Sequence, residues 1–170
     1  HDLSLVLNGQ DAVSYAWRGH GRIDPAQAAA FRQDIGPLLA DLREQEALNQ
    51  RLTHLNTPLG YSAVLGKSGV VMSGGVAYLA AAATVNPETE RVAHRPGPAT
   101  ILIGVEKLDG PLLRDLEENL RIRDARITGP GGDSQGGRSP IVHINGFVVG
   151  QITWTPKLLG MAVLRRAARA

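Results

Sequence analysis

The chain has 170 residues, of which 43% are hydrophobic and 20% are charged, and its formal net charge is +2. This length and composition fit one globular domain with a real core and argue against wholesale disorder. The small positive excess and the 4% of aromatic residues give neither the basic surface nor the stacking side chains typical of nucleic-acid binding, so we expect no nucleic-acid partner. There is no cysteine, which excludes disulfides, thiolate metal ligands and a cysteine nucleophile.

The first 58 residues are predicted to be helical. Residues 2–17 carry apolar side chains near helical spacing and are interpreted as the end of a helix. Asp24 followed by Pro25 is an N-cap signal and predicts a helix as far as Ile35. Gly36-Pro37 breaks or kinks it, and a second helix follows, with a leucine stripe that suits core packing or, alternatively, a dimer face. The leucines of this stripe are Leu38, Leu42, Leu48, Leu52 and Leu55.

A sheet is predicted over residues 60–156. Its strand signals lie at residues 61–65, 70–72, 99–105, 125–128 and 141–154, the last forming a hairpin around Asn145-Gly146. Residues 66–69 are interpreted as a turn, and the five alanines of residues 76–84 predict a short helix. A further helix is expected after Asp109, and residues 129–139 are expected to form a loop. The expected fold is α+β: a PAS-like antiparallel sheet of about five strands with N-terminal helices and a helical crossover.

No motif in the chain predicts catalysis or a metal site. Residues 132–139 resemble a phosphate-binding loop with arginine in place of lysine, but such a loop enters a helix, whereas Pro140 and a strand follow here. The five histidines include no pair spaced for zinc binding. There is no Gly-x-Ser-x-Gly elbow and no prominent carboxylate pair. We therefore expect the isolated domain to be no enzyme and to bind no cofactor or metal.

The segment 76–98 is the best candidate for contact with a ligand. Arg91, His94 and Arg95 lie together there, next to small alanines, and this combination suits a pocket for an anionic or polar small molecule. The alternative interpretation is an ordinary solvated basic loop. Two tyrosines could add polar groups to the same cavity or could be core residues, namely Tyr61 and Tyr78.

A short pattern near the end of the chain resembles a known family. It has the form Gly-x-hydrophobic-x-Trp-x-Pro followed by a glycine, and its residues are Gly150, Ile152, Trp154, Pro156 and Gly160. Together with Val105–Leu113, it resembles the extracytoplasmic sensor domains of the CHASE group, class four. The resemblance covers roughly residues 60–164. Leu159 replaces the family's usual proline, and the tryptophans usual in the family's first helix are missing.

The resemblance implies that residues 1–170 form a single extracytoplasmic sensor domain at the periplasmic face of the inner membrane. The full-length receptor would have flanking transmembrane helices, and residues 157–170 would begin the exit helix. Trp154, Pro156 and Gly160 would transmit the signal in a homodimer, from an unknown small-molecule ligand to a diguanylate cyclase, phosphodiesterase or histidine kinase. The alternatives are a ligand-free PAS-like module for dimerisation or protein interaction, and an enzyme with an unrecognised site.

Overall fold

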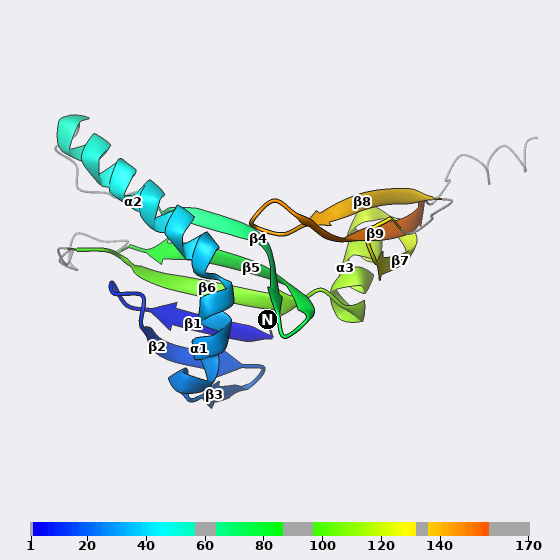
Figure 1. Ribbon diagram of the computed structural model, residues 1–170, viewed down its shortest axis with the longest axis horizontal. Helices are drawn as coiled ribbons and strands as arrows, with labels where there is room; N and C mark the ends of the chain where they lie inside the picture. The colour runs from blue at the N-terminus through cyan, green and yellow to red at the C-terminus, as the bar shows by residue number, and fades with distance from the viewer. Residues whose placement is uncertain (1, 57–63, 87–96, 132–135, 157–170) are drawn as a thin grey trace, which may run out of the picture. The chain divides into compact units, whose positions relative to one another are not determined.

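The computed structural model describes residues 2–56, 64–86, 97–131 and 136–156, with side chains only to residue 51 in the first range. The described residues contain three helices and nine strands (Figure 1). The fold is α+β with mostly antiparallel sheets, as predicted. The chain divides into two compact units: unit 1 is His1–Lys107 with His143–Gly146, and unit 2 is Leu108–Val142 with Phe147–Ala170.

Unit 1 is built on a six-stranded antiparallel sheet with the order β3-β2-β1-β6-β5-β4. Its strands are β1 (Leu3–Leu7), β2 (Val13–Arg18), β3 (Gly21–Ile23), β4 (Gly66–Ser73), β5 (Val76–Val85) and β6 (Thr100–Lys107). Strands β1 to β3 form one meander and strands β4 to β6 form another. The pairing of β1 with β6, in which Leu3 lies opposite Val105 and Leu7 opposite Ile101, joins the two meanders into one sheet.

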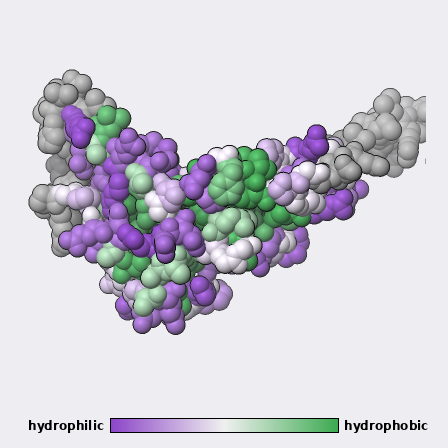
Figure 2. Space-filling model, viewed as in Figure 1, coloured by the Kyte–Doolittle hydropathy of each residue, from purple (hydrophilic) through white to green (hydrophobic). Residues whose placement is uncertain are grey.

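Helices α1 (Pro25–Asp34) and α2 (Gly36–Asn56) cover one face of this sheet (Figure 1). Because side chains alternate between the two faces of a strand, every second strand residue is buried under the helices. The buried core includes Leu3, Leu5, Leu7, Ala80, Ala82, Ile101, Ile103 and Val105 from the sheet, and Phe31, Ile35, Leu38, Leu39 and Leu42 from the helices. On the opposite, solvent-facing side of the helices, hydrophilic residues are frequent (Figure 2).

Two of the three helices predicted before residue 58 are present, α1 and α2. The Asp24 side chain caps α1 by accepting a hydrogen bond of 2.8 Å from the backbone N–H of Ala26, as its N-cap pattern predicts. The leucine stripe of α2 contributes Leu38 and Leu42 to the core, whereas Leu48 is 56% exposed.

The helix predicted for residues 2–17 is wrong, because this segment forms the hairpin of β1 and β2. Leu3, Leu5 and Leu7 are buried while the residues between them are not, which is the period of a strand and not of a helix. Asn8 closes the turn, since its side-chain oxygen accepts hydrogen bonds of 2.9 and 3.0 Å from two backbone N–H groups. The N-terminal part is therefore only partly helical.

The helix predicted for residues 76–84 is also wrong, because the segment lies within β5. Strand β5 pairs with β4 on one side and with β6 on the other, and these pairings outweigh the helix propensity of its alanines. The turn predicted at residues 66–69 lies inside β4. The actual turn is Gly74-Gly75, where both φ angles are positive, 56° and 79°, as a tight two-residue hairpin loop requires. Residues 87–96 of the predicted crossover lie outside the described residues.

The described residues of unit 2 form one helix and a three-stranded sheet of order β7-β9-β8. Its elements are α3 (Gly110–Leu120), β7 (Ile122–Thr128), β8 (Gly137–Val142) and β9 (Val148–Pro156). The helix expected after Asp109, the strand expected at residues 125–128 and the hairpin expected at residues 141–154 are confirmed. Helix α3 ends at Leu120, and the next residue, Arg121, forms a left-handed C-cap with a positive φ of 53°.

The turn between β8 and β9 belongs to unit 1, where it binds the edge strand β4. The backbone N–H of Ile144 donates a hydrogen bond of 2.9 Å to the carbonyl oxygen of Val70, and His143 forms a bridge with the same residue. The Ile144 side chain lies directly over Gly69, where an added Cβ would collide with the Ile144 Cγ2. Glycine at position 69 is therefore required by this close approach.

We expect Gly69→Ala to displace this turn from β4. The new methyl group would overlap Ile144, so the hydrogen bond from Ile144 to Val70 should open more often and the Ile144 amide should exchange at least tenfold faster in amide hydrogen exchange. Gly66→Ala is a matched control, because a Cβ at Gly66 would meet only the Ala82 carbonyl oxygen, at an ordinary 3.7 Å. Equal exchange rates at Ile144 in the two variants would contradict this packing.

Candidate functional site

A pocket of about 380 Å³ lies on the helix side of the unit 1 sheet. Its apolar wall comes from the sheet and from α1, and the remaining lining is charged or glycine. The lining residues are Leu3, Phe31, Tyr78, Val105, Asp2, Arg18, Lys107 and Gly19. This combination of an apolar wall with a few charged groups is typical of small-molecule sites.

The sheet register brings these residues together. Leu3 of β1 pairs with Arg18 of β2 on one side and with Val105 of β6 on the other. In the neighbouring row, Tyr78 of β5 lies opposite Lys107 of β6. Two cationic residues and one tyrosine, which are far apart in the sequence, therefore line the same end of the sheet.

Tyr78 is positioned by an aromatic contact with α1. Its ring meets Phe31 edge-on, with the ring centroids 5.5 Å apart and an interplanar angle of 87°. The contact holds the tyrosine side chain between the sheet and the helix. Tyr78 is thus the one residue of the predicted ligand set that the structure describes, and it lines this pocket.

The acidic residue of the pocket is engaged with the backbone. The Asp2 carboxylate accepts a hydrogen bond of 2.7 Å from the backbone N–H of Lys107. The backbone N–H of Asp2 donates a second hydrogen bond, of 2.9 Å, to the Val105 carbonyl oxygen. With Arg18 and Lys107 also in the lining, the pocket carries an excess of one positive charge. A guanidinium and an ammonium beside a tyrosine suit a carboxylate or phosphate group.

The other predicted ligand residues, Tyr61, Arg91, His94 and Arg95, lie outside the described residues. Sequence reasoning missed Arg18, Lys107 and Phe31. Arg18 follows a segment that was interpreted as a helix, and its position beside Leu3 becomes evident only once that segment is paired as a strand. The alternation of Leu3, Leu5 and Leu7 is the signal that could have revealed it.

A second polar cluster ties α2 to two other segments of unit 1. The Arg43 guanidinium binds the carboxylates of Asp11 (Nη2 to Oδ1, 2.7 Å) and Glu46 (Nη1 to Oε2, 2.6 Å). It also donates hydrogen bonds to the carbonyl oxygens of Asn8, at 3.3 Å, and Ala99, at 2.8 Å. Glu46 accepts a further bond of 2.6 Å from the Ala99 N–H. One guanidinium therefore holds the β1–β2 turn and the residue preceding β6 against the helix.

The surroundings of Arg43 favour the protonated, positively charged form of its guanidinium group. Burial alone would lower the pKa of Arg43, but the hydrogen bonds and negative charges of Asp11 and Glu46 outweigh it, so the pKa is raised. Stabilisation from a raised pKa is fully present below the ordinary arginine pKa and is lost only as the pH rises through the folded value. The Arg43 contribution is therefore constant across the physiological range, which fits a structural role.

The residues predicted to transmit a signal, Trp154 and Pro156, end strand β9 in unit 2, while Gly160 lies outside the described residues. The Trp154 indole packs on its register partner in β8, Gly137, where an added Cβ would collide with the ring. Pro156 pairs with Ile122 at the start of β7. Transmission through these residues stays a prediction.

We expect Arg43→Met to lower the free energy of unfolding by about 3 kcal/mol, because it leaves the buried Glu46 carboxylate without its cation. Urea denaturation measures this change. Arg51→Met is the control, since it removes an exposed arginine from the same helix and should change stability by less than about 0.5 kcal/mol. A loss no larger than that of the control would show that the cluster does not anchor α2.

We expect Gly137→Ala to force the Trp154 indole out of its packing position and to shift its fluorescence emission to longer wavelength. Gly129→Ala is the control, because nothing lies within 4 Å of a Cβ there. The chain has two tryptophans, and Trp17 should contribute equally to both variants, so the difference spectrum reports on Trp154. Identical spectra would contradict the packing of the indole on β8.

Three further observations bear on function. None of the described helices has the length and apolar character needed to cross a membrane. In the described ranges, no three histidine or carboxylate side chains are grouped so that they could hold a metal ion. Comparison of the chain with family models and with curated proteins finds no match. What the chain does must therefore be inferred from its own residues.

Proposed function

We propose that this chain is the ligand-sensing input domain of a transmembrane signalling receptor, displayed at the periplasmic face of the inner membrane. The receptor's output would control cyclic-di-GMP turnover through a diguanylate cyclase or phosphodiesterase, or would signal through a histidine kinase. The domain itself would perform no chemistry. The sequence support is the pattern ending in Trp154-x-Pro156, which resembles sensor domains of the CHASE group, class four.

The arrangement of unit 1 supports a PAS-like plan. Two antiparallel meanders share one sheet, and both helices of unit 1 come between them in the chain and cover the same face. A ligand can therefore bind between the sheet and the helices, at the edge of the core. Such a layout suits sensing, because a molecule bound between helix and sheet contacts both layers.

The pocket beside Tyr78 is the observation that carries the proposal. Its volume of about 380 Å³ lies in the range that holds a small organic molecule. Phe31 and Tyr78 offer an aromatic wall, and Arg18 and Lys107 offer two cationic groups. We infer that the ligand is a small molecule with one acidic group and one apolar part.

Signalling would follow from a shift in populations. A ligand that contacts both α1 and the sheet stabilises the packing in which Phe31 and Tyr78 close around it, at the expense of any packing in which they separate. The shift can be no larger than the ratio of the ligand's affinities for the two packings. The resemblance to the CHASE group implies that Trp154 and Pro156 would pass this change on to the output domain.

A ligand-free module for dimerisation is the second candidate. The observation that favours it is the exposed apolar face of the unit 1 sheet, where Tyr15 and Trp17 are 58% and 49% exposed. A module of this kind would need no pocket chemistry, so the response of the protein to anions separates the two functions.

We expect a small carboxylate or phosphate compound to raise the melting temperature of the chain in a thermal-shift screen of dicarboxylates, amino acids and nucleotides. At a concentration of 100 times Kd the ligand stabilises the fold by about 2.7 kcal/mol, which corresponds to a shift of roughly 5–10 °C for a domain of this size. Arg18→Ala should raise Kd at least tenfold, because it removes a charge-assisted hydrogen bond.

The control variant is Arg114→Ala, which removes an exposed arginine of α3 in unit 2 and should leave the shift unchanged. Tyr78→Phe should weaken binding less than Arg18→Ala, since it keeps the ring that packs on Phe31. No response to any anion in the screen, or equal loss of response in the Arg18 and Arg114 variants, would rule out this pocket as the sensing site.

A further inference from the structure

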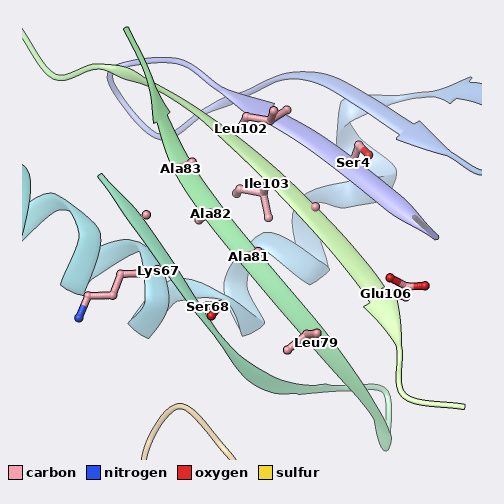
Figure 3. A pocket seen from close by; sticks show the side chains of 12 residues that line it. Ser4, Lys67, Ser68, Leu79, Ala81, Ala82, Ala83, Leu102, Ile103 and Glu106 are labelled. Atoms are coloured by element: carbon pink, nitrogen blue, oxygen red, sulfur yellow. The ribbon is translucent and has the colours of Figure 1, made fainter. Parts of the chain in front are cut away.

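The face of the unit 1 sheet opposite the helices carries large exposed apolar side chains. Register and alternation place Ser4, Leu79, Ala81, Ala83, Leu102 and Gly104 on this outer face, and Figure 3 shows it with the helices behind the sheet. Its large apolar residues are Tyr15, Trp17, Leu79, Val85 and Leu102, which are between 39% and 58% exposed. Single exposed apolar residues need no explanation, but five on one face of one sheet indicate an interaction surface.

Large and small residues are segregated on this face. The aromatic residues Tyr15 and Trp17 stand on β2, whereas the corresponding rows of β5 hold Ala83 and Ala81. The register shows the first row as Trp17, Ser4, Gly104, Ala81 and Ser68, and the second as Tyr15, Val6, Leu102, Ala83 and Gly66. The small residues line a hollow of about 520 Å³ (Figure 3).

We propose that a second copy of this chain covers the outer face, related by a two-fold axis that runs parallel to the strands between β1 and β6. The sheet has three strands on each side of this line, so the axis exchanges β2 with β5. Trp17 of each copy then lies over Ala81 of the other, and Tyr15 lies over Ala83. Each aromatic residue fills the hollow that the alanines leave, and each contact occurs twice, as an isologous interface requires.

The size of the face fits a stable dimer. Six strands at a spacing of ~4.8 Å and a length of about six residues at ~3.3 Å each give roughly 600 Å² of sheet. Two such faces bury about 1,200 Å², which is the lower limit for specific protein interfaces. Two sheets packed face to face lie about 10 Å apart, close enough for an aromatic ring to reach alanines of the opposite sheet.

The distribution of charge also favours a partner of the same kind. The two central rows are those that contain Trp17 and Tyr15, and neither holds a charged residue on any strand from β2 across the sheet to β4. Two charged residues line the hollow itself, Lys67 of β4 and Glu106 of β6, and Figure 3 shows them at opposite ends of it. At the margin beside β2, the Arg22 guanidinium lies 5.1 Å from the centroid of the Tyr15 ring. An uncharged centre within a charged rim is the usual composition of an interface between proteins.

Sedimentation of the full chain at tens of micromolar tests the proposal, and we expect a dimer. Ala81→Arg places a charged side chain in the hollow and should weaken dimerisation at least a hundredfold, while the exposed position of Ala81 leaves the fold intact. Ala47→Arg makes the same exchange at an exposed position of α2 and should have no effect. A protein that remains monomeric at this concentration would overturn the proposal. The same holds if the monomer binds an apolar small molecule in the hollow.

Exchanging the sizes of the facing residues tests the pairing itself. Trp17→Ala removes the ring from the hollow, and Ala81→Trp places a ring opposite another ring, so each should weaken the dimer at least tenfold. The double variant restores one ring and one alanine at each contact and should recover most of the lost affinity. A double variant weaker than both single variants would refute the contact between Trp17 and Ala81.

Cross-linking locates the axis. Because the chain has no cysteine, single introduced thiols report on one position each. Ser4 lies on β1 beside the axis, so a bis-maleimide that spans about 10 Å, the spacing of two packed sheets, should join two copies of the Ser4→Cys variant. It should not join copies of Glu44→Cys, which lies on the exposed side of α2. Cross-linking of the Glu44 variant alone would place the interface on the helices and overturn the proposal.

Discussion

The pairing of β1 with β6 is the constraint on which unit 1 depends. Without it the chain would form two separate meanders, each with one apolar face and neither with a complete core. The partners are far apart in the sequence, since Leu3 meets Val105, so the loop-closure entropy must be overcome before this pairing contributes stability. The Arg43 cluster offsets part of that cost, because it holds the residue before β6 and the turn after β1 against the same helix.

The same two strands serve both proposed functions. On the helix side, Leu3 and Val105 form part of the wall of the pocket beside Tyr78. On the outer side, their neighbours Ser4 and Gly104 lie at the centre of the face that a second copy would cover. A ligand that adjusts β1 or β6 would therefore act directly on the dimer interface through the thickness of a single sheet. The proposed sensing and the proposed dimerisation need no long path between them.

Local signals in the sequence were sufficient for the helices. Asp24-Pro25 and Gly36-Pro37 act through cap chemistry and a fixed φ, which depend only on neighbouring residues. The same holds for the Asn145-Gly146 turn. Strands β1 and β5 were assigned as helices because their identity depends on partners distant in the sequence. Five alanines predict a helix in isolation, and only pairing with β4 and β6 makes them a strand.

The candidate site could be predicted only in part for the same reason. The sequence predicts Tyr78 as a polar residue beside a crossover, and Tyr78 does line a pocket, but its neighbours there are set by the register of the strands. Arg18 and Lys107 are each at the end of a strand, and neither has a local motif. Their proximity follows from which strand lies beside which, and a single sequence does not encode that in any short pattern.

Strand β5 has a consequence for the chain before it folds. Val76–Val85 is a run of ten residues without charge, proline or glycine, which is the composition of segments that assemble into intermolecular sheets. In the folded protein both of its edges are occupied, one by β4 and the other by β6. Any condition that opens the sheet would expose these edges to other chains, so the packing that forms the core also protects the protein against aggregation.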